Sequence, residues 1–334
     1  AKTLDFGLDF TVLNGKLDAS FDWYTRRTVD ILMNGTKLPA VLGATVPKRN
    51  TGELKTNGWE LSFKWKDQLS NGIRYDIGLV LSDYQSEVIK FSGNPNKLLS
   101  SLYDGMKMGE IWGYETVGIL QESDFTVDEN GKYTLIGPSQ TKIQSTIYPG
   151  DVRYADLDGD GEITKGDETV DNPGDRKIIG NSTPRFHYGI TGNISWKNFD
   201  LNIFFQGIAK RDVWISDNVF WGGSGTAGNW EMYNNSWTPE HTDAKYPMYA
   251  GRISSIQQTG YLFNGAYLRL KTLALGYTLP REWTNKVKLS TVRLSLSGYN
   301  LFEISQIPDL YDPDQISSSY PMMRSVAFGL QVGF

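Results

Sequence analysis

The chain has 334 residues, no cysteine, two histidines and a formal net charge of −5. These counts exclude disulfides, thiol chemistry and cysteine-ligated zinc, and two histidines far apart in sequence exclude a histidine-rich zinc site. The mild negative charge without basic blocks argues against nucleic acid as a partner. No apolar run reaches the roughly 18 residues that predict a transmembrane helix.

In chain order, the predicted elements are strands, because apolar and polar residues alternate. Residues 4–12 carry Leu, Phe, Leu, Phe and Val at the even positions and small or polar residues at the odd ones. The same alternation returns at 59–65, 186–196 and 326–334. A period of two predicts strands with one apolar and one polar face, and an all-β protein.

The whole pattern predicts nine antiparallel strands. They cover 3–13, 16–33, 53–66, 73–90, 186–196, 199–212, 263–279, 290–303 and 322–334. The leucines at 268 and 270 are out of phase with those at 273 and 275, which predicts a bulge near Lys271 and Thr272.

Two-faced strands fit either a membrane barrel or a soluble, secreted β-sandwich that binds glycans and holds a structural calcium ion. Long alternating runs match tilted strands that cross a bilayer, and Trp23, Trp65 and Trp196 near strand ends are typical of an interfacial girdle. The polar face carries charged residues that suit a wet or plugged lumen, namely Asp5, Asp9, Glu60, Lys64 and Arg293. We therefore favour a transmembrane antiparallel β-barrel, with the sandwich as the alternative.

Short and long connections alternate along the chain. The long ones are 34–52, 91–185, 213–262 and 304–321. Outer-membrane barrels have short periplasmic turns and long extracellular loops, so the segments 91–185 and 213–262 are predicted to be extracellular. A complete bacterial barrel has an even strand number and no open edge in lipid. Nine strands therefore predict that residues 1–334 are the C-terminal part of a larger barrel.

Several segments resemble a known family. The last strand closes on Phe334, as in outer-membrane barrels that present this terminal signal to their assembly machinery. The runs PGDVRYADLDGDG at 149–161 and IIGNSTPRF at 178–186 are similar to segments of the SusC/RagA family of TonB-dependent transporters, as are 265–271, 276–277 and 297–302.

The resemblance implies a 22-stranded barrel in the outer membrane of a Bacteroidetes-like Gram-negative bacterium, plugged by an N-terminal domain. It implies import of glycans or peptides, without enzymatic activity, driven through the plug by the TonB–ExbB–ExbD system. It also implies a SusD-like surface lipoprotein that caps the barrel as a lid. The plug, the TonB box and the earlier strands have no counterpart in this sequence, so a further segment is expected to supply them.

An acidic run at 156–167 fits a calcium loop, with carboxylates at loop positions 1, 3, 5 and 12 and glycine at position 6. Oxygens that converge on a hard cation are the required chemistry, although aspartate at position 12 reaches less far than glutamate. The candidate ligands are Asp156, Asp158, Asp160, Glu162 through its carbonyl, Thr164 and Asp167. We expect a structural Ca²⁺; the alternative is a solvated acidic turn.

The segment 213–262 is rich in aromatic residues, which stack on sugar rings and also anchor protein interfaces. The candidates are Trp214, Phe220, Trp221, Trp230, Tyr233 and Trp237. Contact with the lid, contact with substrate and packing of the segment on itself all remain open. No catalytic or organic-cofactor site is expected, because His187 and His241 lack a serine or cysteine partner at a recognisable spacing.

Overall fold

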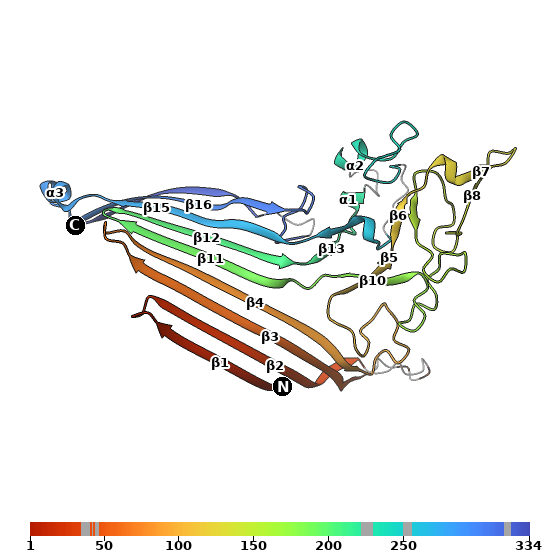
Figure 1. Ribbon diagram of the computed structural model, residues 1–334, viewed down its shortest axis with the longest axis horizontal. Helices are drawn as coiled ribbons and strands as arrows, with labels where there is room; N and C mark the ends of the chain where they lie inside the picture. The colour runs from red at the N-terminus through yellow and green to blue at the C-terminus, as the bar shows by residue number, and fades with distance from the viewer. Residues whose placement is uncertain (35–40, 42, 44–46, 222–229, 250–255, 317–321) are drawn as a thin grey trace.

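The computed structural model describes residues 1–34, 41, 43, 47–221, 230–249, 256–316 and 322–334. Within these ranges, nine long strands form one antiparallel sheet, and each pairs with the next long strand in sequence (Figure 1). They are β1 (Lys2–Val12), β2 (Leu17–Asn34), β3 (Lys48–Gln68), β4 (Arg74–Phe91), β11 (Arg185–Trp196), β12 (Phe199–Lys210), β15 (Tyr267–Thr278), β16 (Thr291–Ser305) and β17 (Ser325–Gly333). The predicted strand number and order are confirmed.

Short turns join strands at one end of the sheet, and the long connections leave from the other end (Figure 1). In the turn between β1 and β2, Leu13, Asn14 and Gly15 have φ of 54°, 56° and 77°. Asparagine and glycine tolerate this left-handed region, which matches the twist of a tight hairpin. Lys197, with φ of 54°, makes the equally tight turn between β11 and β12.

Two details of strand register bear on the predictions. The pairing of β15 with β16 shifts between Leu270 and Thr272, which confirms the predicted bulge. In contrast, β3 begins at Lys48, five residues before the predicted start at 53. The hairpin with β2 continues through irregular pairings such as Met33 with Arg49, where alternation no longer marks the strand.

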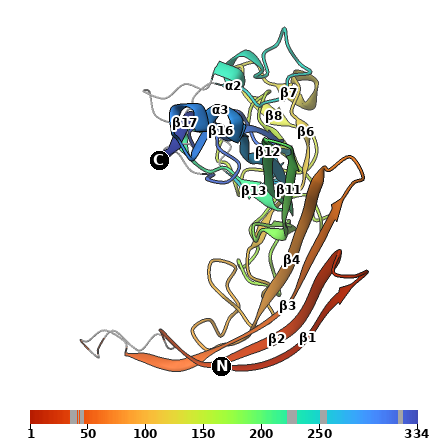
Figure 2. The same ribbon diagram turned by 90° about the vertical axis from the view of Figure 1, so that its left-hand side faces the viewer.

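The apolar face of the sheet is exposed. On β1, Leu4, Phe6 and Leu8 keep 64%, 65% and 54% of their surface accessible, and Phe328 on β17 keeps 71%. In a sandwich a second sheet would cover this face, so the sandwich alternative is wrong for the described part of the chain. The strands curve into an open wall with β1 and β17 at its free edges (Figure 2).

The long connections hold the remaining elements, apart from short helices at the opposite end of the sheet. The short strands there are β5 (Glu110–Tyr114), β6 (Thr116–Ile119), β7 (Phe125–Val127), β8 (Tyr133–Leu135), β9 (Val152–Tyr154), β10 (Arg176–Asn181), β13 (Asp212–Trp214) and β14 (Leu262–Asn264). They pair among themselves and not with the nine-stranded sheet. The α-helices are α1 (Asn218–Trp221), α2 (Trp230–Asn234) and α3 (Arg281–Thr284), with α3 beside the short turns. Short 3₁₀ helices cover Glu122–Asp124, Thr259–Tyr261 and Asn285–Val287. In the described ranges no helix is long and apolar enough to span a bilayer.

Candidate binding surfaces in the long connections

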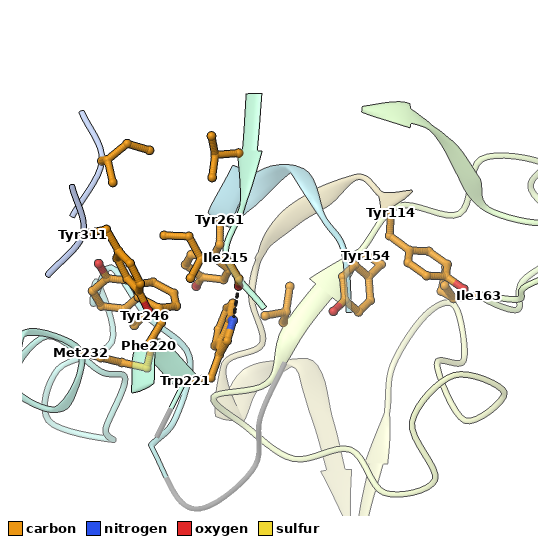
Figure 3. Close-up of a cluster of buried hydrophobic side chains, with 13 residues drawn as sticks. Tyr114, Tyr154, Ile163, Ile215, Phe220, Trp221, Met232, Tyr246, Tyr261 and Tyr311 are labelled. Atoms are coloured by element: carbon orange, nitrogen blue, oxygen red, sulfur yellow. Dashed lines mark hydrogen bonds between the residues drawn. The ribbon is translucent and has the colours of Figure 1, made fainter. Parts of the chain in front are cut away.

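The main buried core of the protein lies in the long connections. Thirteen buried residues from three parts of the chain pack into one cluster (Figure 3). Tyr114 and Tyr154 come from the connection between β4 and β11, Trp221 and Tyr261 from that between β12 and β15, and Tyr311 follows β16. The cluster therefore ties these connections into one packed body at the end of the wall.

Three of the six candidate aromatic residues are buried in the long connections, and two of them, Phe220 and Trp221, belong to this cluster. Phe220 and Trp221 are 1% and 4% exposed, and their rings meet edge to face with centroids 5.0 Å apart. The indole N–H of Trp221 donates to the carbonyl of Ile215 at 2.6 Å (Figure 3). Trp237 is also buried, and its indole N–H donates to Gln121 at 2.9 Å. Burial of these three side chains favours packing within and between the long connections over contact with a lid or a substrate.

The other candidates lie nearer the surface. Trp230 and Tyr233 stand one helical turn apart on α2, are 73% and 58% exposed, and make an edge-to-face contact at 5.8 Å. Tyr233 also contacts Tyr249 edge to face at 5.6 Å. We call Trp230, Tyr233 and Tyr249 the aromatic row. Trp214 is half-buried against Trp221, with ring centroids 5.7 Å apart.

The structure brings together part of the predicted calcium loop. Carboxylate oxygens of Asp156, Asp158 and Asp175 lie within 4.8 Å of one another. Asp175 is fully buried, and its carboxylate accepts the backbone N–H groups of Leu157 at 2.8 Å and Thr164 at 2.7 Å. Asp175 lies outside the twelve-residue spacing of the predicted loop, so that spacing does not single it out. It returns to the loop through the turn that precedes β10.

The other candidate ligands serve the loop's own hydrogen bonds or lie beside the group of three. Asp160 accepts the N–H of Glu162 at 2.8 Å, and Asp167 accepts the side-chain amide of Asn172 at 3.0 Å. The hydroxyl of Thr164 accepts the N–H of Gly166 at 3.2 Å. The carboxylates of Asp160, Glu162 and Asp167 are outside the group that Asp175 completes.

The electrostatics of this group fit a hard cation. The pKa of Asp158 is raised: the hydrogen bond from the Asp160 amide lowers it, but desolvation and repulsion by neighbouring carboxylates raise it by more. The pKa of Asp156 is lowered, chiefly by the hydrogen bond from the Gly161 amide. Converging carboxylate oxygens are the donors that Ca²⁺ prefers.

The polar face of the wall is cross-linked by side chains. The Lys64 ammonium lies 3.6 Å from Asp76, which accepts the amide of Asn193 at 2.9 Å, and Asn193 accepts that of Asn202 at 2.7 Å. Arg293 forms a two-pronged ion pair with Asp200. The inward positions of Lys64 and Arg293 thus stabilise contacts between strands.

Known proteins similar to this chain are bacterial receptors. TonB-dependent receptor P3 of Formosa agariphila is 32% identical over 361 residues, which cover 100% of this chain and 34% of the relative. TonB-dependent receptor SusC of Bacteroides thetaiotaomicron is 24% identical, with 99% and 32% covered. No family model matches.

Among solved structures, the RagAB peptide importer in its 'open-open' state has a TM-score of 0.72 at 22% identity. The match covers 99% of this chain and 34% of that one, and shows the shared fold. The chain spans about a third of the length of the relatives it matches. The open wall and its exposed apolar face agree with what these relatives indicate. The chain belongs to the SusC/RagA family of TonB-dependent receptors.

Proposed function

We propose that this chain forms part of the barrel wall of a TonB-dependent importer in the outer membrane of a Bacteroidetes-like bacterium. The observation that carries the proposal is the exposed apolar face, which only lipid would cover favourably, opposite a face of paired polar side chains. In this account the chain is a C-terminal portion, and the long connections 91–185 and 213–262 lie outside the cell. The substrate is a glycan or a peptide.

The chain's own part in transport is structural. Its apolar side chains contact lipid, and its polar face lines the lumen beside a plug supplied by the rest of the receptor. The connections form a packed body at the extracellular end of the wall, where a SusD-like lipoprotein would dock as a lid. Energy from TonB–ExbB–ExbD enters through the plug, and no bond is made or broken by this chain.

Uptake by intact cells tests the function. Cells that express the full-length receptor should accumulate labelled oligosaccharides or labelled peptides. This accumulation should stop when TonB is inactivated. Accumulation that persists without TonB, or recovery of the receptor from the soluble fraction, would refute the proposal.

Trp230 and Tyr233 of the aromatic row are proposed as a contact of the lid, because large exposed rings are typical interface anchors. Replacing Trp230 and Tyr233 together by alanine should reduce lipoprotein that co-purifies with the receptor by roughly tenfold or more. Trp283→Ala is the matched control, since Trp283 is 57% exposed on α3 near the short turns. Equal loss in both variants would contradict the contact.

We also propose that Asp156, Asp158 and Asp175 hold a structural Ca²⁺. Terbium luminescence on the full-length receptor should rise on binding and fall when Ca²⁺ competes, and chelation should speed proteolysis of 91–185. Asp158→Asn should remove the luminescence. Asp128→Asn, in an exposed turn where Asp128 accepts the amides of Asn130 and Lys132, should not. Unchanged luminescence in Asp158→Asn would overturn the site.

A further inference from the structure

The outward side chains of β2, β3 and β4 change character toward the end that carries the long connections. The register aligns them in rows across the three strands. In order, the rows are Phe21/Leu61/Leu81, Trp23/Trp59/Asp83, Thr25/Asn57/Gln85 and Arg27/Lys55/Glu87. Tryptophan pairs between an apolar and a polar band mark the boundary between hydrocarbon and head groups.

A polar hollow of about 240 Å³ lies directly beyond the tryptophan pair. Its lining includes Trp23, Trp59, Asn57 and Lys55. Lys107 reaches the hollow from the connection after β4, which folds back so that residues 87 and 107 form a bridge. The hollow is therefore built from β2, β3, β4, the first residue of β11 and a returning loop, and not from a single segment.

The cations around the hollow divide into paired and unpaired groups. Arg185 forms an ion pair with the buried carboxylate of Asp83, and Arg27 forms one with Glu53. Within the described part of the chain, the exposed ammonium groups of Lys55 and Lys107 make no ion pair within 4.0 Å. Two carboxylates share this lining: Asp83, which pairs with Arg185, and Glu87, which is opposite Lys55 on β4. Lys55 and Lys107 together with Glu87 leave one net positive charge beside the side-chain amides of Asn57 and Gln85.

The position of the hollow selects its occupant. The outward face of a barrel wall meets lipid whatever the plug or lid covers on the inside. At the end with long connections the neighbouring lipid is the outer leaflet, whose glycolipid head groups carry phosphates. Phosphate accepts charge-assisted hydrogen bonds from lysine, and basic side chains at membrane surfaces attract anionic lipid.

We propose that this hollow binds the phosphate of an outer-leaflet glycolipid. Lys55 and Lys107 provide the charge, Asn57 and Gln85 donate hydrogen bonds to the head group, and Trp23 with Trp59 contacts the lipid where chains meet head group. The inference rests on the proposed function, since it requires the wall to sit in the outer membrane.

The test is native mass spectrometry of the full-length receptor, released from detergent with added lipid. The lipids are a diphosphorylated glycolipid and the same glycolipid after enzymatic dephosphorylation. The variant is Lys55→Glu with Lys107→Glu. The control is Lys132→Glu with Lys286→Glu, which makes the same charge change at two exposed positions outside the hollow.

The hollow variant should bind roughly tenfold less diphosphorylated glycolipid, while the control matches the parent. Parent and hollow variant should bind the dephosphorylated lipid equally. Equal binding of the phosphorylated lipid by all proteins, or displacement of it by millimolar inorganic phosphate, would overturn the inference. TonB-dependent uptake by the same cells separates the glycolipid proposal from the proposed function. If uptake continues and the lysine substitutions leave lipid binding unchanged, only the glycolipid proposal is refuted.

Discussion

Replacing Arg269 by alanine should destabilise the receptor by about 3–5 kcal/mol. Arg269 is 1% exposed on β15, and one of its nitrogens donates to both carboxylate oxygens of Asp312 at 2.8 and 2.7 Å. The variant would leave Asp312, whose side chain is 7% exposed, charged and unpaired. Unfolding in urea, followed by tryptophan fluorescence of the full-length receptor, measures the loss.

The pH dependence gives the same prediction a second readout. Burial acts to raise the pKa of Asp312, but hydrogen bonds from Arg269 and from the Asp314 amide outweigh it and hold the pKa below its usual range. A lowered pKa stabilises the fold above the ordinary aspartate pKa, and the gain disappears as pH falls through the lowered value. The difference between parent and Arg269→Ala should therefore be full at neutral pH and shrink in strong acid.

A double variant distinguishes the cost of leaving a buried charge unpaired from the cost of losing the Arg269 side chain itself. Arg269→Met combined with Asp312→Leu removes both charges, and should recover most of the stability, because buried ion pairs are often replaceable by apolar groups. A loss below about 1 kcal/mol in Arg269→Ala would contradict the view that this pair fastens the segment after β16 to the wall.

Trp221→Ala should cost about 3–5 kcal/mol, because it empties the centre of the packed body. Trp221 is 4% exposed and contacts Phe220 and Tyr261 edge to face. Limited trypsin digestion should cut earlier at Lys245, which lies in the same connection, and urea unfolding should begin at lower concentration.

Trp230→Ala is the matched control, since Trp230 is a tryptophan of the same connection but 73% exposed. Its stability should stay within about 0.5 kcal/mol of the parent, although its effect on the lid should be large. If Trp230→Ala opened the connection to trypsin as readily as Trp221→Ala, the division between core and surface aromatics would be wrong.

The strands of the wall could be predicted because each one needs apolar side chains on one face and polar side chains on the other. Apolar side chains on alternate residues, as in 4–12, define both the strand and its outward face, and the phase change at Lys271 reveals the bulge. The early start of β3 was not predictable, since pairing of Arg49 with Met33 depends on the neighbouring hairpin strand and not on alternation.

The long connections resist sequence reasoning for a different reason. Their helices are too short to show a repeating pattern of apolar residues. The local sequence therefore does not distinguish Phe220, which is buried, from Trp230, which is exposed. The carboxylate group likewise recruits Asp175 through a return of the chain that the loop spacing does not contain. Composition indicated the chemistry of both regions, whereas tertiary packing decided which residues carry it.

The most direct test of the account is the side of the membrane on which each end of the wall lies. The chain has no cysteine, so Ser145→Cys in the connection 91–185 and Ser70→Cys in a short turn can each be introduced alone, in a full-length receptor otherwise free of cysteine. Both serines are exposed. A membrane-impermeant maleimide should label Ser145→Cys on intact cells, and Ser70→Cys only after the outer membrane is permeabilised. Labelling of both on intact cells, or of Ser70→Cys alone, would contradict a lipid-embedded wall with its long connections outside.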